Sequence, residues 1–172
     1  MNIVLIGMRG SGKTTVGRLL AERLGKRFIE MDEMITGKAG TSIAEIVARH
    51  GWPEFRKIEA EITSTVAGLD NTVNATGGGV VTSEANIRAL RETGKLVWLR
   101  ASLTTLLERT QHDPSRPSLT GKPPDEDMAV IFKERLPFYQ QAADFTVDTD
   151  GATPEAVAET IINLLATGES CG

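Results

Sequence analysis

The chain has 172 residues, of which 40% are hydrophobic and 24% charged, and its formal net charge is −4. This length suits one domain with a sizeable core, and the acidic balance argues against a general nucleic-acid-binding protein, which is usually basic. The lone Cys171 excludes an internal disulfide, and the first apolar run, about five residues with no basic leader, suits neither a signal peptide nor a membrane span. We therefore expect a cytoplasmic protein that binds neither nucleic acid nor a membrane.

Short apolar runs alternate along the chain with longer segments of helical spacing, which is the pattern of strands followed by helices. The run "NIVLIG" predicts the first strand, and the segment from Lys13 predicts a helix that ends at Gly25. Four further strands are predicted at residues 27–32, 72–79, 95–101 and 145–149. The remaining helices are predicted at residues 42–51, 84–94, 103–110, 128–143 and 153–168, and another carries the apolar stripe Phe55, Ile58, Ile62 and Val66.

Local signals support several of these boundaries. Ser42 and Glu45 have the spacing of a capping box, Thr153 suits an N-cap, and Pro137 predicts a kink. Residues 111–127 are rich in proline, glycine and charge and predict a loop. The alternation as a whole predicts an α/β sandwich in one domain, with a mostly parallel five-stranded sheet flanked by helices. We expect a monomer, since no further apolar stripe is sustained.

A glycine-rich motif follows the first predicted strand and precedes a helix. Gly7, Gly12, Lys13 and Thr14 match the pattern GxxxxGK[ST], in which backbone amides and the positive end of the helix bind phosphates. Lys13 would reach the β- and γ-phosphates, and the Thr14 hydroxyl would bind Mg²⁺. The alternative is a glycine-rich turn with no ligand. The predicted ATP-binding residues here are Gly10, Ser11, Gly12, Lys13, Thr14 and Thr15.

Two further groups stand where neighbouring strands are predicted to end, the edge at which parallel sheets bind ligands. Glu30 and Asp32 have an i, i+2 relation that would point both carboxylates the same way from a strand. They would bind Mg²⁺ or orient a hydroxyl, unless they are only the charges of a solvated turn or a helix start. The glycines at 77–79 would let backbone amides approach a small polar molecule, unless they form only an irregular loop.

Three arginines are candidates for binding an acidic acceptor, because the guanidinium group donates two parallel hydrogen bonds to a carboxylate or phosphate. Arg56 and Glu59 lie one turn apart and are both placed away from the apolar stripe of their predicted helix. Arg116 lies in the proline-rich loop. Arg135 follows Ile131 by one turn, which places it near the buried side of its helix. Each arginine has a simpler interpretation as a solvated or ion-paired surface residue.

Several motifs together resemble those of the shikimate kinases. They are "GMRGSGKTTVGRLLAERL", "FIEMD", "FRKIE", "TGGG", "SRPSL" and "ERLPFYQ", in the order and spacing of that family, and the resemblance runs from Ile3 to about Leu165. It implies a nucleoside monophosphate kinase-type fold with parallel strand order 2-3-1-4-5, a shikimate-binding helical region at about 33–62 and a lid at about 111–124. The implied reaction is transfer of the γ-phosphoryl group of ATP to the 3-hydroxyl of shikimate, on the route to chorismate.

The resemblance also implies roles for individual residues. On the acceptor side, Asp32 would orient or deprotonate the attacking hydroxyl, and the other implied acceptor-binding residues are Arg56, Glu59, Gly77, Gly78, Gly79 and Arg135. On the nucleotide side, Arg116 would close with the lid over ATP and stabilise charge on the transferring group, with Gly121 as a possible hinge. Arg109 and Pro154 resemble the positions that flank adenine.

The sequence departs from the family pattern at Glu30, where members usually have an aspartate linked to Mg²⁺, often through water. Glutamate keeps the charge but is one methylene longer, and we expect activity to survive because Thr14 and the phosphates also bind the ion. Thr36 is a second departure, from glutamate. Two alternatives remain open at this stage: a gluconate-type or other small-molecule kinase of the same fold, and a non-catalytic ATP-binding module.

Overall fold

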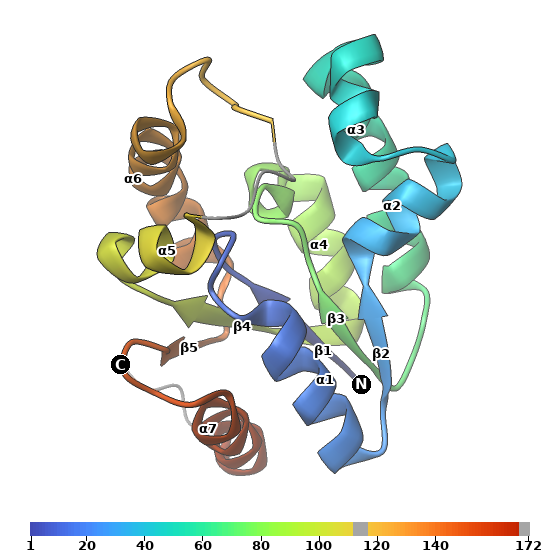
Figure 1. Ribbon diagram of the computed structural model, residues 1–172. Helices are drawn as coiled ribbons and strands as arrows, with labels where there is room; N and C mark the ends of the chain where they lie inside the picture. The colour runs from blue at the N-terminus through green and yellow to red at the C-terminus, as the bar shows by residue number, and fades with distance from the viewer. Residues whose placement is uncertain (112–116, 169–172) are drawn as a thin grey trace.

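The computed structural model describes residues 1–111 and 117–168. Its centre is a sheet of five strands: β1 (Asn2–Ile6), β2 (Arg27–Glu30), β3 (Thr72–Ala75), β4 (Gly94–Arg100) and β5 (Phe145–Asp148). The spatial order is β2-β3-β1-β4-β5, and every neighbouring pair is parallel. The α/β class predicted from alternation and the strand order implied by the resemblance are both confirmed (Figure 1).

Helices cover both faces of this sheet (Figure 1). They are α1 (Lys13–Leu24), α2 (Met31–Ala39), α3 (Ile43–Ala67), α4 (Glu84–Thr93), α5 (Leu103–Thr110), α6 (Pro124–Ala142) and α7 (Pro154–Thr167), and a 3₁₀ turn spans Val80–Thr82. α1 and α7 pack on one face, whereas α2, α3, α4 and α6 contribute to the core on the other. None of the helices in the described part of the chain has the length and apolar character needed to cross a bilayer.

The central strand β1 shows why the first apolar run has no polar alternation. Ile3 and Leu5 point into the core formed with α1 and α7, and Val4 and Ile6 point into the core on the opposite face. All four side chains are at most 1% exposed. Because both faces of a parallel sheet are covered by helices, each successive side chain of a central strand must be apolar.

Several predicted helix ends are confirmed by their hydrogen bonds. The Ser42 side chain accepts a hydrogen bond from the backbone N–H of Glu45, and the Thr153 side chain accepts one from Ala156. Gly51 breaks the helical conformation inside α3, with φ 81° and ψ 172°, where the first of two predicted helices was expected to end. Residue types with special backbone or capping chemistry therefore defined these boundaries from sequence alone.

The strand predicted at residues 27–32 was wrong in its second half. β2 ends at Glu30, and the next nine residues, Met31–Ala39, form α2, which was not predicted. Glu30 is the N-cap of this helix and Asp32 lies in its first turn, so the i, i+2 strand geometry does not apply. An acidic residue is favourable in the first turn because of the helix dipole, and this preference competes with the extended conformation. α6 also starts earlier than predicted, at Pro124 rather than residue 128, and is a single helix through Pro137.

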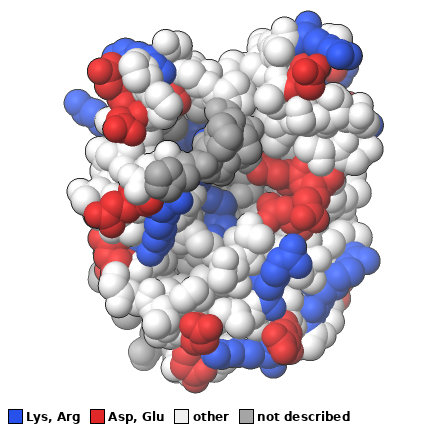
Figure 2. All heavy atoms as spheres, viewed as in Figure 1, with Lys and Arg blue, Asp and Glu red and all other residues white. Residues whose placement is uncertain are grey.

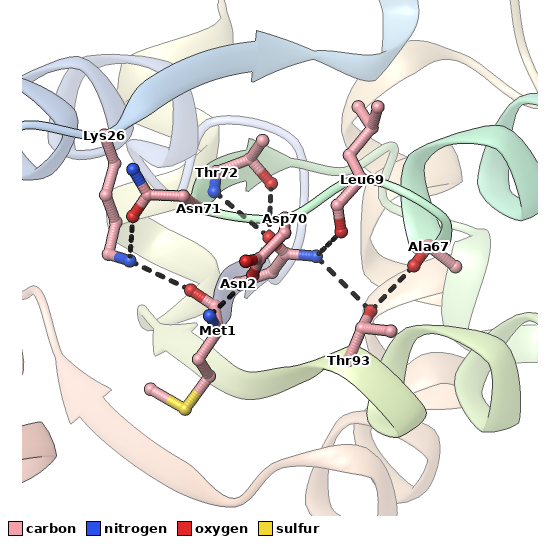
Figure 3. A network of polar contacts seen from close by, with 9 residues as sticks. All are labelled: Met1, Asn2, Lys26, Ala67, Leu69, Asp70, Asn71, Thr72 and Thr93. Carbon is pink, nitrogen blue, oxygen red and sulfur yellow. Dashed lines mark hydrogen bonds and ion pairs between the residues drawn. The ribbon is translucent and has the colours of Figure 1, made fainter.

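The amino ends of the strands are joined by a network of polar contacts, shown in Figure 3. The side chain of Asn2 is its centre: its amide donates to the carbonyl of Leu69 at 2.7 Å and to the hydroxyl of Thr93 at 3.3 Å. Its oxygen accepts from the backbone N–H and the hydroxyl of Thr72. Asn2 is 1% exposed, and this network satisfies its polar atoms where β1 and β3 begin.

Candidate active site

A cavity of about 1290 Å³ lies at the opposite, carboxyl edge of the sheet. The segment after β1, the segment after β3, the kinked helix α3 and the helix α6 all contribute to its lining. Figure 2 shows basic atoms on the floor of this hollow and acidic atoms on the wall next to α2. Pockets for one small molecule are typically about 300–1,000 Å³, so this cavity has room for two ligands side by side.

The glycine-rich loop forms one end of the cavity. Gly10 and Gly12 have φ of 85° and 95°, a left-handed conformation that glycine adopts without strain. The Lys13 ammonium group donates to the carbonyls of Gly7 and Met8 at 2.7 and 2.9 Å, so it lies over the loop in which a phosphate would bind. Among the residues predicted to bind ATP, the lining of the cavity includes Gly10, Gly12, Lys13, Thr14 and Thr15, whereas Ser11 is buried.

The side-chain oxygens of Thr14 and Glu30 lie in contact next to this loop. The Thr14 hydroxyl donates to the Glu30 carboxylate at 2.5 Å. Burial raises the pKa of Glu30, and the charge of Asp32 adds to this effect, although the hydrogen bond from Thr14 lowers it. A desolvated carboxylate beside a hydroxyl suits a hard cation such as Mg²⁺. Among the described residues, no group of three or more His, Cys, Asp or Glu side chains is arranged so that it could hold a metal ion.

The three glycines after β3 each lie against a different charged side chain. A Cβ atom on Gly77 would lie 3.0 Å from Oε2 of Glu59 and 3.3 Å from Oδ1 of Asp32. A Cβ on Gly78 would lie 3.0 Å from Nη1 of Arg135, and one on Gly79 would overlap the guanidinium group of Arg56.

None of the three glycines at 77–79 has a positive φ, so their backbone conformation does not require glycine. The lack of a side chain matters instead because charged groups of α2, α3 and α6 press against this loop. The simpler interpretation, an irregular loop, does not account for these contacts.

Arg56 and Glu59 form a half-buried ion pair on α3. Nη1 of Arg56 donates to Oε1 of Glu59 at 2.8 Å, and the side chains are 31% and 2% exposed. The guanidinium group also lies over the rings of Trp52 and Phe55, 5.6 and 5.2 Å from their centroids. Burial raises the pKa of Glu59, and the charge of Arg56 opposes the rise. The placement of Glu59 away from the apolar stripe was wrong: it lies on the buried face with Phe55 because it carries a partner for its charge.

Arg135 completes the basic floor of the cavity. It is half-buried and lines the cavity from α6, and burial lowers its pKa, with the charge of Arg56 adding to the effect. The two arginines come from helices far apart in the sequence but act on each other electrostatically. Two guanidinium groups held close together in a partly dry site would bind an anionic ligand more strongly than either would in water.

The three residues implied to contact the nucleotide outside the P-loop differ in where the structure places them. Arg109 lines the cavity and donates to the carbonyl of Gly10 at 3.2 Å and to that of Thr149 at 3.3 Å. Pro154 starts α7 and is not among the cavity-lining residues. Arg116 and residues 112–115 of the expected lid lie outside the described residues. Among the lining residues that sequence reasoning missed are Arg9, Thr76 and Met128, because nothing in their local pattern separates them from core or surface positions. Other lining residues fall inside the predicted acceptor-binding region or the predicted lid but were not named individually: Trp52, Phe55, Leu119 and Lys122.

The fold and the glycine-rich loop together define a protein of the P-loop kinase class, with a basic pocket beside the loop. The family model for shikimate kinase matches residues 9–166. A shikimate kinase from Moorella thermoacetica is 47% identical over 95% of this chain and 94% of that protein, and one from Thermodesulfovibrio yellowstonii is 43% identical over 94% and 92%. The structure of a shikimate kinase from Acinetobacter baumannii in complex with shikimate superposes with a TM-score of 0.93, at 34% identity over 98% of this chain and 94% of that one.

The chain belongs to the shikimate kinase family. This confirms the family predicted from the sequence motifs, and with it the prediction of an ATP-using phosphotransferase. The family model covers the P-loop from Arg9 onward, α2, α3, the glycines at 77–79 and α6.

Proposed function

We propose that this protein transfers the γ-phosphoryl group of ATP to the 3-hydroxyl of shikimate, giving shikimate 3-phosphate and ADP. The observation that carries the proposal is the convergence of Arg56, Arg135 and Asp32 on the glycines at 77–79, beside the P-loop. Shikimate presents a carboxylate and several hydroxyls, and this pocket offers two guanidinium groups and a carboxylate within one cavity. The simultaneous presence of a phosphate loop and this pocket supports a kinase rather than a non-catalytic ATP-binding module.

The residues on the acceptor side would bind shikimate and orient its 3-hydroxyl toward the γ-phosphate. Arg56 and Arg135 would bind the shikimate carboxylate, and the backbone at Gly78 and Gly79 would contact the ring substituents. Asp32 would then accept a hydrogen bond from the 3-hydroxyl and align its oxygen with the γ-phosphate. The ion pair with Glu59 keeps Arg56 in a fixed orientation, so little side-chain freedom is lost when the acceptor binds. Placing the two reactants in line is the main requirement of phosphoryl transfer.

The nucleotide side would stabilise charge. The loop amides and Lys13 would contact the phosphates, and Lys13 would exchange its present contacts with the carbonyls of Gly7 and Met8 for phosphate oxygens. Thr14 and Glu30 would hold Mg²⁺, with the phosphates and water completing its coordination shell. When bound, the ion neutralises negative charge on the phosphates. Arg109 would contact the adenine side of the nucleotide, and the roles of Pro154 and Arg116 stay predictions.

Within the single domain, we assign the proposed functions to separate segments of the chain. The helical region at about 33–62 would bind the acceptor, and residues 111–124 would form a lid that excludes water from the transferring group. A monomer with shikimate and ATP as its partners is sufficient for this chemistry, because the described residues of one chain line both halves of the cavity.

The test is ADP release from ATP and Mg²⁺ with shikimate, with gluconate and with no acceptor. We expect release only with shikimate, and a loss of about 10²–10⁴-fold in kcat for Asp32→Asn, since this change removes the group that orients the hydroxyl. Glu33→Gln is the matched control, because Glu33 lies next to Asp32 in α2 but is exposed and does not line the cavity. Release with gluconate in place of shikimate would refute the acceptor. Release with neither would refute the kinase reaction.

A further inference from the structure

Tyr139 is a fully buried tyrosine that none of the predicted roles includes. It lies on α6, one turn after Arg135, and is 1% exposed. Its ring stacks on Trp98 of β4, with centroids 5.7 Å apart and planes inclined by 20°. Its hydroxyl donates to the carbonyl of Gly78 at 2.6 Å. The one polar atom of this ring is therefore used on the acceptor-side glycine loop.

The Gly78 peptide is a junction between the two halves of the cavity. A Cβ on Gly78 would lie 3.0 Å from Nη1 of Arg135 and 3.6 Å from both the backbone nitrogen of Arg9 and the carbonyl oxygen of Gly7. The peptide is thus packed between an arginine of the acceptor pocket and the backbone of the P-loop. A small rotation of this peptide would change the positions of its amide and of the arginine beside it.

The Tyr139 hydroxyl keeps its proton throughout the physiological range. Burial raises the pKa of Tyr139 to about 12, although the charge of Arg135 lowers it in part. The hydroxyl consequently remains a hydrogen-bond donor to the Gly78 carbonyl, and its oxygen presents lone pairs toward the neighbouring guanidinium group.

We propose that Tyr139 is a positioning residue of the acceptor site: its hydroxyl fixes the Gly78 peptide and, through it, the orientation of the glycine loop and of Arg135 toward the acceptor. The proposal rests on the proposed function, because it concerns the same pocket. It assigns to the hydroxyl a role in acceptor affinity that is separate from the packing role of the ring. Tyr139 touches neither reactant in this assignment and acts only through groups that do.

The experiment is Tyr139→Phe, which removes one oxygen atom and keeps the ring on Trp98. We expect the KM and the Kd for shikimate to rise about tenfold, because the freed Gly78 peptide loses its fixed orientation. The KM for ATP and kcat should stay within about twofold of wild type, since Lys13, Thr14 and Asp32 are unchanged. Hydrogen exchange in a peptide covering residues 76–81 should become faster, a readout that does not depend on turnover.

The control is Trp98→Phe, which weakens the same ring stack but leaves the hydroxyl bond to Gly78 in place. It should lower the melting temperature more than Tyr139→Phe does and leave the KM for shikimate unchanged. An unchanged KM and Kd in Tyr139→Phe would overturn the proposal. An equal rise of KM in Trp98→Phe would also overturn it, by showing that packing alone sets acceptor affinity. Failure of the proposed function is a different result, because wild type itself would then release no ADP with shikimate.

Discussion

The two edges of the parallel sheet handle buried polar groups in opposite ways. At the amino edge, the side chain of Asn2 has four hydrogen bonds to groups of the surrounding chain. At the carboxyl edge, Oε2 of Glu59 is buried without a hydrogen-bond partner among the described residues, and Arg56 and Arg135 stand beside each other in one cavity. The polar groups of the first edge satisfy one another, whereas those of the second leave part of their bonding capacity for a ligand.

This difference separates stability from function in one small domain. Breaking a satisfied buried network leaves several groups without partners and destabilises the fold. Changing a group that is incompletely satisfied in the free protein costs less stability, but it removes an interaction that the ligand would make. Variants at the amino edge should therefore lower the free energy of unfolding and leave kcat and KM unchanged. Variants at the carboxyl edge should change kcat or KM and leave the free energy of unfolding nearly unchanged.

The largest effect is expected for Asn2→Ala. The loss of the Asn2 side chain leaves the carbonyl of Leu69 and the backbone N–H of Thr72 without their present hydrogen-bond partner. We therefore expect the free energy of unfolding to fall by about 3 kcal/mol. Urea unfolding measures the change, and kcat and both KM values should stay at wild-type levels. Lys26→Ala is the control from the same network, since the hydrogen bonds of the Lys26 ammonium group are exposed to solvent and their loss should cost less than about 0.5 kcal/mol. A kinetic defect in Asn2→Ala would contradict the separation of the two edges.

The second largest change in stability is expected at Asn74, which lies within the sheet in β3. Its side chain is 0% exposed, and neither its oxygen nor its nitrogen has a hydrogen-bond partner in the described structure. Asn74→Val should raise the free energy of unfolding by about 1–2 kcal/mol, because it removes the desolvation cost of an amide from an apolar site. Denaturant midpoints compared at equal m-values give the change. Lower stability would show that Asn74 does have a partner, such as a buried water molecule.

A change of about tenfold is expected in the KM for shikimate with Gly79→Ala. The new methyl group would overlap the guanidinium group of Arg56, and this flexible side chain can move aside, so the fold should be retained while the acceptor contact is displaced. Steady-state kinetics with varied shikimate tests this. Gly37→Ala in α2 is the control, since a Cβ there meets no atom within 4 Å. Equal KM values in the two variants would refute the close-approach role of Gly79.

The smallest change in stability is expected for the ion pair between Arg100 and Asp148, at the ends of β4 and β5. These two residues belong to the carboxyl edge of the sheet but do not line the cavity. Arg100 donates to both carboxylate oxygens of Asp148, at 2.5 and 2.9 Å, and this holds the pKa of Asp148 below its ordinary value. A lowered native pKa contributes stability above the unfolded pKa that is lost as the pH falls through the native value.

Asp148→Asn should therefore cost about 0.5 kcal/mol or less at pH 7, because both partners are largely exposed. The difference from wild type should begin to shrink as the pH falls below about 4, the ordinary pKa of an aspartate, and should vanish only below the lowered native pKa. Unfolding measured across that pH range checks the sign. A constant difference at every pH would show that the pair acts through packing and not through charge.

Much of the fold was accessible from the sequence because it depends on local patterns. The uninterrupted apolar run at 3–6 indicated a strand covered on both faces, and the order of glycines, lysine and threonine indicated a phosphate loop before any geometry was known. The helix at Met31–Ala39 was missed because "FIEMD" begins as an apolar run, and the competing preference of acidic residues for a helix start has a weaker signal.

By itself, then, the sequence determined the alternating fold, the phosphate loop and, through its motifs, the family. The tertiary structure alone decided which charges meet at 77–79, that Glu59 is buried beneath Arg56, and that Tyr139 holds the Gly78 carbonyl. The physical reason is the separation along the chain of the residues that specify each feature. A strand, a cap or a phosphate loop is specified by residues adjacent along the chain. The acceptor pocket is specified by contacts between α2, α3, α6 and the loop after β3, whose separation in sequence carries no information about their separation in space.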